Sequence, residues 1–114
     1  MKKIKVYPMK SKTSGLPVVN QFIIYEKTPK TKIFTFQSYD TIICKVVSKI
    51  GEFDKIILDD YALEYSRTTS KYLYNFLDTF SIIHLEAYKD KAGERKKQIL
   101  QAIKDKEIQI KNLN

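Results

Sequence analysis

The sequence is poor in the residue types that build disulfides, zinc sites and phosphate loops. Its 114 residues include one Cys, one His, three Gly, three Pro and no Trp. A single cysteine excludes an intramolecular disulfide, and one Cys with one His cannot complete a zinc site. The glycines stand apart at 15, 51 and 93, which excludes a glycine-rich loop that cradles phosphate. We therefore expect no metal and no cofactor.

The two residues most suited to nucleophilic catalysis are expected to be structural. Cys44 lies inside the apolar run 41–47, which is typical of a small core residue rather than a nucleophile. His84 lies between Ile83 and Leu85, where a lone histidine is more often structural than half of a catalytic Cys–His pair. The sequence therefore predicts a non-enzymatic protein.

The adjacent carboxylates Asp59 and Asp60 form the best acidic cluster. Successive side chains of a strand point to opposite faces, whereas metal-assisted phosphoryl transfer needs carboxylates that converge on one point. We expect instead a strand end followed by a turn, in which an aspartate bonds its own backbone.

Arginine and long apolar segments are scarce as well. Only two arginines accompany 19 lysines, and the net charge is +8. This charge favours an acidic partner, either nucleic acid or an anionic protein surface, but lysine lacks the bidentate fork that reads phosphates and guanines. No apolar run approaches the ~18 residues of a membrane span, and no apolar signal segment follows the first lysines. We expect a cytoplasmic protein without membrane contact.

The positive charge is concentrated in the two terminal thirds. Residues 1–32 hold eight lysines against one glutamate, a net charge of +7. Residues 33–88 have a net charge of −3, and residues 89–114 have +4. An electrostatic surface would therefore be built from both ends of the chain.

The hydrophobic patterns predict one α+β domain over residues 1–114, with an antiparallel four- or five-stranded sheet and two helices packed on one face. A first strand should end near Pro8, and a hairpin should join strands 18–26 and 33–38 across the Lys-rich turn 27–32. Further strands are expected at 40–48, 55–59 and 108–110.

A change of period at about residue 69 predicts the first helix, with Thr68 or Thr69 as its N-cap. A second helix is expected at 92–104, while 82–88 fits helix or strand. The predicted core between sheet and first helix consists of six residues, namely Phe34, Phe36, Tyr72, Leu73, Phe76 and Leu77.

The segment 61–72 has the most unusual composition, with three Tyr, four Ser or Thr, one Arg and one Lys. Hydroxyls, cations and aromatic rings together can hold a phosphate and stack a base. The same composition suits a connection tied down by its own hydrogen bonds at a helix start. The candidate binding residues come from this segment and from the basic ends: Tyr61, Tyr65, Arg67, Lys71, Lys30, Lys32, Lys96 and Lys97.

Several stretches of the sequence resemble a family of short uncharacterised proteins encoded by phages, plasmids and integrative elements of low-GC Gram-positive bacteria. They lie within 18–78 and the last twenty residues or so, and include Phe36–Ile43, Tyr65–Tyr72 and Asn112–Asn114. The turn at 27–32 is longer than the family pattern, and 80–91 resembles an insertion.

The resemblance implies a protein of a mobile genetic element. Such proteins handle transferred DNA or counter host defence, for example by occupying the nucleic-acid site of a CRISPR effector nuclease. Our first hypothesis is therefore an anti-CRISPR inhibitor that binds a host protein. The alternative is a module that binds single-stranded nucleic acid through the basic termini and the Tyr-rich surface.

Overall fold

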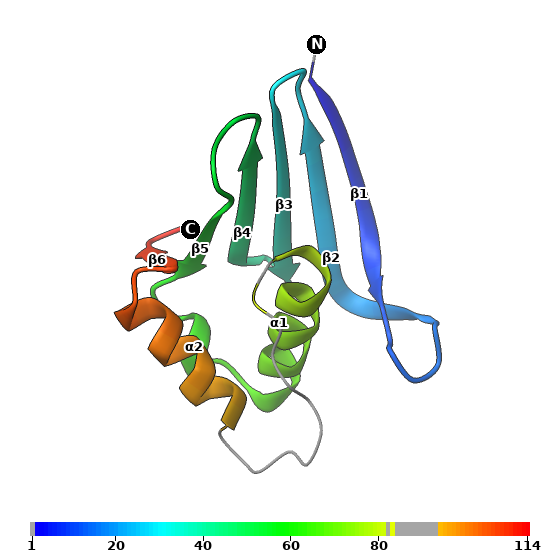
Figure 1. Cartoon of the computed structure of the whole chain (residues 1–114). Coiled ribbons are helices and arrows are strands. Elements are labelled where there is room, and N and C mark those ends of the chain that lie inside the picture. Colours follow the sequence, from blue (N-terminus) through cyan, green and yellow to red (C-terminus); the bar gives the residue numbers. More distant parts are fainter. Residues whose placement is uncertain (1, 82, 84–93) are drawn as a thin grey trace.

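The computed structural model describes residues 2–81, 83 and 94–114, and its centre is a sheet whose strands follow chain order, β1 to β6 (Figure 1). Strands β1 to β5 form an antiparallel meander, and β6 runs parallel to β5. The strands are β1 (Lys3–Lys10), β2 (Pro17–Lys27), β3 (Thr31–Ser38), β4 (Thr41–Lys49), β5 (Lys55–Asp59) and β6 (Ile108–Lys111).

The α+β class is confirmed, but the expected four- or five-stranded antiparallel sheet is wrong in strand number and direction. The sheet has six strands and is mixed, because Ile56 to Asp59 pair in parallel with Ile108 to Lys111. A helical connection lies between β5 and β6 in the chain, and such a crossover is what a parallel pair requires. The alternation at 108–110 predicted the strand, but not its partner.

The hairpin of β2 and β3 is confirmed, with a tighter turn than expected. Lys27 already pairs with Lys32 across the two strands. The Thr28 N–H donates to the Thr31 carbonyl at 2.8 Å, and the Thr31 N–H donates to the Thr28 hydroxyl at 3.1 Å. These two hydrogen bonds close the turn and set the register of the whole hairpin.

The first helix, α1 (Arg67–Phe80), begins earlier than predicted, after a 3₁₀ turn, η1 (Ala62–Glu64). Its N-cap is Ser66, whose hydroxyl accepts the Thr69 N–H at 3.3 Å. The expectation of a Thr68 or Thr69 cap is wrong, because both residues are already inside the first helical turn. The Thr69 side chain is buried and lies 3.3 Å from the Ser38 hydroxyl.

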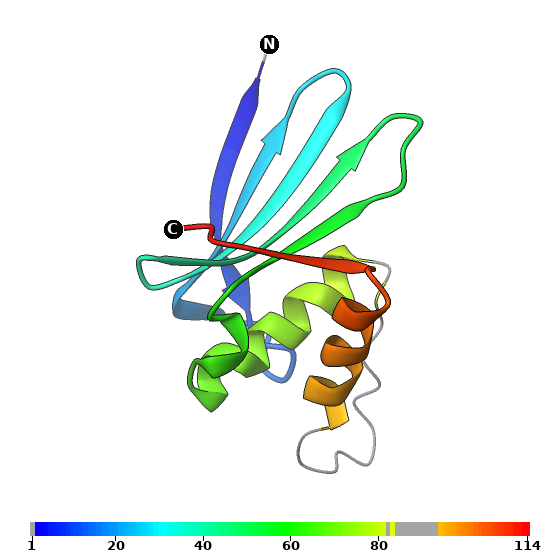
Figure 2. The same ribbon diagram turned by 90° about the vertical axis from the view of Figure 1, so that its left-hand side faces the viewer.

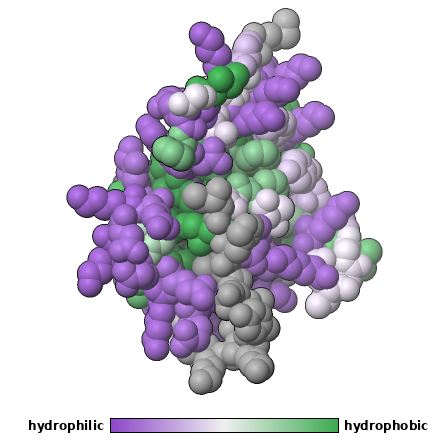
Figure 3. Space-filling model, viewed as in Figure 1, coloured by the Kyte–Doolittle hydropathy of each residue, from purple (hydrophilic) through white to green (hydrophobic). Residues whose placement is uncertain are grey.

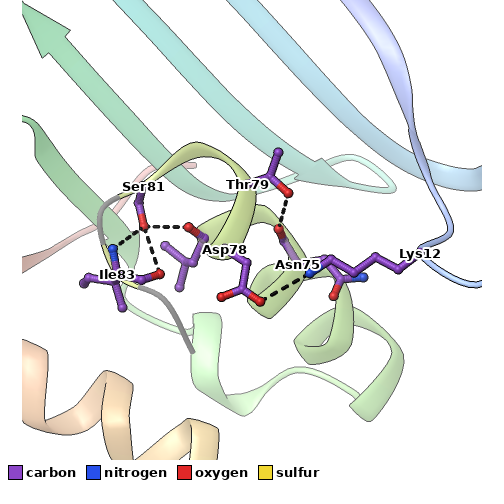
Figure 4. Close-up of polar contacts among 7 residues, drawn as sticks. Lys12, Asn75, Asp78, Thr79, Ser81 and Ile83 are labelled. Atoms are coloured by element: carbon purple, nitrogen blue, oxygen red, sulfur yellow. Dashed lines mark hydrogen bonds and ion pairs between the residues drawn. The ribbon is translucent and has the colours of Figure 1, made fainter. Parts of the chain in front are cut away.

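Polar contacts hold the other end of α1 (Figure 4). The Ser81 N–H and hydroxyl both donate to the Leu77 carbonyl, at 3.0 and 2.7 Å. The Lys12 ammonium, from the β1–β2 connection, lies 3.2 Å from the Asp78 carboxylate. These contacts end the helix and attach it to the first connection of the sheet.

The second helix, α2 (Glu94–Lys104), packs against β6. It adds the buried Ile99 and Ala102 to the same core as α1, and Figures 1 and 2 show the two helices on one side of the sheet. The predicted helix residues 92 and 93, His84 and most of the ambiguous segment 82–88 lie outside the described residues. None of the described helices is long and apolar enough to cross a membrane.

The predicted core between sheet and α1 is confirmed. Phe36, Leu73, Phe76 and Leu77 are fully buried, Tyr72 is nearly so, and Phe34 packs half-buried against them. Cys44 is buried in the same cluster, where desolvation raises the pKa of its thiol, as expected for a structural cysteine.

The end of the chain is fastened to β4 and β5 by one carboxylate and one amide. Asp59, only 2% exposed, accepts the Tyr61 N–H at 3.2 Å, which confirms the predicted turn. It also accepts the Leu113 N–H at 2.9 Å and the Asn114 side-chain amide at 3.1 Å. That amide pairs with both backbone groups of Ile42, at 2.7 and 2.9 Å, and so continues the edge of β4 beyond β5.

Candidate functional site

The eight predicted binding residues do not form one surface. Lys30 and Lys32 lie at the β2–β3 turn, at one end of the sheet. Tyr61 and Tyr65 follow the last residue of β5, which lies at the opposite end because β5 runs antiparallel to β4. Figure 1 shows the two ends at the top and bottom of the sheet.

The tyrosine end is lined by carboxylates as well as by aromatic rings. Tyr61 and Tyr65 border a depression of about 360 Å³ together with Asp40, Asp59, Asp60, Asn112 and Asn114. Burial raises the pKa of the Tyr65 hydroxyl, and the charges of Asp59 and Asp60 raise it further. A phosphate group in this depression would face carboxylates, so the depression is a poor anion site.

The remaining predicted residues lie exposed on the two helices. Arg67 begins α1, and the Lys71 ammonium lies 5.6 Å from the centre of the Tyr72 ring. Lys97 on α2 lies 3.8 Å from the Glu94 carboxylate, beside the exposed Lys96. Among residues 2–81, 83 and 94–114, no three His, Cys, Asp or Glu side chains gather closely enough to hold a metal ion.

The structure brings together three lysines, of which the sequence patterns singled out only Lys32. Lys3 pairs with Lys27 across β1 and β2, and Lys27 pairs with Lys32 across β2 and β3. Because directly paired residues point to the same face, these three side chains form one line across three strands, here called the lysine row. All three are exposed, and none forms an ion pair or hydrogen bond with another described residue.

Two more lysines extend the positive charge around the hairpin turn. Lys30 and Lys49 line a hollow of about 210 Å³ together with Lys27 and Lys32. The Ile50 N–H donates to the Lys30 carbonyl at 3.1 Å, which holds the turn against the end of β4. Figures 2 and 3 show this end of the sheet projecting beyond the helices, with hydrophilic side chains around it.

An aromatic ladder starts beside the lysine row on the same face. The next paired line of residues on that face contains Lys5, Tyr25 and Phe34. Tyr25 stacks on Phe34 at 4.9 Å, and Phe34 stacks on Phe80 of α1 at 4.6 Å. The half-buried Tyr25 ring is thus held rigidly where the basic end meets the core.

The face of the sheet opposite the helices is apolar over much of its width. Alternate residues of the strands point to it, and we call it the open face. Its apolar members are Ile4, Val6, Phe22, Ile24, Ile33, Val47 and Ile57. Ile4 and Val6 are 58% and 62% exposed, and the others are half-buried. Figures 1 and 2 show both described helices on the other face of the sheet.

The open face carries a basic bias. Lys45 lies near its centre, paired with Thr35 and Ile57, and Lys55 pairs with Val47 at the same face. The Glu26 carboxylate also points there, but it lies 3.0 Å from the Lys2 ammonium and is neutralised by it. The sequence itself contains an indication of this apolar face. The segments 22–25 and 56–58 are apolar without alternation, which is typical of strands with two apolar faces.

Comparison with known proteins places the chain in a family without an assigned activity. The model of the family of unknown function DUF8033 matches residues 4–101, so the chain belongs to that family. The expected resemblance to uncharacterised proteins is confirmed at the level of the family, over a range that begins nearer the N-terminus than expected and ends before the stretch Asn112–Asn114. No curated protein and no solved structure matches the chain.

Proposed function

We propose that this member of the DUF8033 family acts without catalysis, by binding another protein through the open face of its sheet. The observation that carries the proposal is the set of apolar side chains on the open face, which includes Val6 and Ile24 on one side of Thr35 and Lys45, and Ile57 on the other. Helices α1 and α2 pack on the opposite face of the sheet, toward the end away from the β2–β3 turn (Figures 1 and 2).

Burial of the open face by a docked protein is energetically favourable. An antiparallel sheet with one solvated face normally alternates apolar and polar residues, whereas sheets covered on both faces have apolar runs. Each apolar side chain buried on docking contributes in proportion to the area removed from water, at roughly 25 cal/mol per Å². Contiguous exposed apolar residues with a polar border are typical of protein interaction sites.

The charges on the open face define the chemistry of the partner. Lys45 and Lys55 point to this face, while its one described surface carboxylate, that of Glu26, is paired with Lys2. A second copy of the chain would bring like charges together. We therefore propose a partner surface that combines apolar side chains with carboxylates, complementary in both respects.

The resemblance to proteins of mobile genetic elements supports a narrower form of this proposal. In that setting the partner is a host protein, and a CRISPR effector nuclease is the example that matches our first sequence hypothesis. The small size and the lack of a catalytic pattern support an inhibitor that acts by occupying a surface.

The test is capture of partners from a host lysate by the tagged protein, with nuclease treatment to remove nucleic acid. Val6→Glu adds a carboxylate to the open face at an exposed edge position. Leu100→Glu makes the same kind of change at an exposed apolar residue of α2 and is the matched control. Circular dichroism should first establish that both variants fold.

We expect a partner that survives nuclease treatment, binds the purified wild type and the Leu100→Glu variant alike, and binds the Val6→Glu variant at least tenfold more weakly. Binding should also weaken with salt, because the charges of the two surfaces are complementary. Equal binding by both variants would overturn the proposal. So would a dimer of the purified protein that Val6→Glu dissociates, because the occupant would then be a second copy.

A further inference from the structure

We infer that the lysine row, Lys3, Lys27 and Lys32, binds the phosphodiester backbone of single-stranded nucleic acid. This site lies at the hairpin end, on the face opposite the open face, so it is independent of the protein-docking proposal. It also differs from the basic residues that the sequence suggested, since of those only Lys32 belongs to the row and Lys30 borders it.

The first argument is electrostatic. Directly paired residues on neighbouring antiparallel strands have Cβ atoms about 5 Å apart, and like charges at such positions oppose each other. The lysine row contains two such pairs in succession, and no described carboxylate neutralises them. Solubility alone would be served equally well by lysines on alternating faces. A line of unpaired cations on one face is the arrangement that a chain of phosphates neutralises.

The second argument is the shape of the surroundings. Lys27, Lys30, Lys32 and Lys49 surround a hollow of about 210 Å³ rather than a flat patch. The hollow is held open by the turn hydrogen bonds and by the Ile50 N–H donating to the Lys30 carbonyl. Lys27 and Lys32 of the row therefore border, together with Lys30, a space that can take a phosphate group.

The third argument selects a single strand over a duplex. Tyr25 lies one paired line away from the row on the same face, and its ring is held by stacking on Phe34 at 4.9 Å. An aromatic ring beside a basic track is the usual device for stacking an unpaired base. No arginine is near, so the bidentate readout of guanine is missing and binding should be independent of sequence.

The experiment measures fluorescence anisotropy of a labelled 20-nucleotide oligothymidine with the purified chain between 30 and 200 mM salt. For a single strand the slope of log K against log salt changes by about 0.7 for each phosphate contact. Lys27→Gln should make the slope shallower by about that amount and weaken binding about tenfold at low salt. The control Lys104→Gln removes the same charge from the exposed end of α2 and should change neither quantity by more than about twofold.

Two further measurements make the result specific. Tyr25→Leu should weaken binding severalfold and leave the salt slope unchanged, because it removes stacking and no charge. In the absence of nucleic acid, Lys27→Gln should unfold at a higher temperature than the wild type at low salt, since it relieves repulsion within the row. This second readout does not depend on the ligand.

Three results would overturn the inference. One is an absence of binding at 30 mM salt, and another is an equal effect of Lys27→Gln and Lys104→Gln, which would indicate diffuse charge rather than a site. The third is duplex DNA binding as tightly as the single strand with no effect of Tyr25→Leu. Loss of protein docking in Val6→Glu would change none of these measurements, so failure of one proposal is distinguishable from failure of the other.

Discussion

Removing the Asp59 carboxylate should detach the end of the chain and destabilise the whole sheet. Asp59 accepts three hydrogen bonds, from Tyr61, Leu113 and Asn114, although only 2% of its surface is exposed. Asp59→Ala leaves two backbone N–H groups and one amide without their acceptor. Because β6 directly precedes the anchored residues, its pairing with β5 should weaken at the same time.

The magnitude follows from the number and environment of the lost bonds. A hydrogen bond to a charged group contributes about 1.5–3 kcal/mol, and donors left unpaired in a buried site cost about 1–3 kcal/mol. Leu113 is half-buried and Asn114 is exposed, so water will replace part of what is lost. We therefore expect Asp59→Ala to reduce the free energy of unfolding by about 3–5 kcal/mol, a large share of the roughly 5–15 kcal/mol of a typical domain.

Urea unfolding followed by circular dichroism measures this loss. Asp60→Ala is the matched control, because Asp60 is exposed and the three hydrogen bonds from Tyr61, Leu113 and Asn114 all end on Asp59. It should change stability by less than about 0.5 kcal/mol. Asn114→Ala should cost less than Asp59→Ala, and the double variant should show a coupling energy of about 0.5–1 kcal/mol because the two side chains share one bond. A loss below about 1 kcal/mol for Asp59→Ala would refute the anchor.

Two further predictions concern the N-cap of α1 and the buried thiol. Ser66→Ala should lower the free energy of unfolding, measured in urea, by about 1 kcal/mol, and Thr68→Ala should lower it by much less. The reason is that the Ser66 hydroxyl accepts the Thr69 N–H at the start of α1. A larger loss for Thr68→Ala would instead support the cap predicted from the sequence. Burial raises the pKa of the Cys44 thiol, so above its unfolded pKa of about 8.5 the unfolded chain loses a proton that the folded chain keeps. Stability should therefore fall by about 1.4 kcal/mol per pH unit above about pH 8.5, and Cys44→Ala should lack this component; equal pH slopes in the two proteins would contradict the assignment.

The strands and the first helix could be predicted because their signals are local. The segment 55–59 is a strand over the predicted residues, and the β2–β3 hairpin surrounds the predicted turn. The spacing of Leu73, Phe76 and Leu77 placed one stripe of α1 in the core, where all three are buried. Such periodicities depend on the geometry of one element alone, so they can be read without knowing its neighbours.

For the candidate sites, the sequence predicted the kind of residue involved but not which residues lie together. The excess of lysine in residues 1–32 indicated a basic surface. The side chain of each strand residue points to one of two faces, and a shift of register by one residue reverses the choice. The alignment of Lys3, Lys27 and Lys32 depends on two registers at once, that of β1 with β2 and that of β2 with β3. For the same reason, the open face became visible only after the helices had been placed on the other one.

The sequence by itself determined the class of the fold, the hairpin, the core of α1 and the burial of Cys44, because each follows from the composition or period of a short segment. The tertiary structure alone decided the parallel pairing of β6 and the fastening of Asn114 to Ile42, which lies 72 positions earlier. Contacts over such separations depend on how the intervening elements pack and on the entropy of closing the loop between them. No local pattern contains that information.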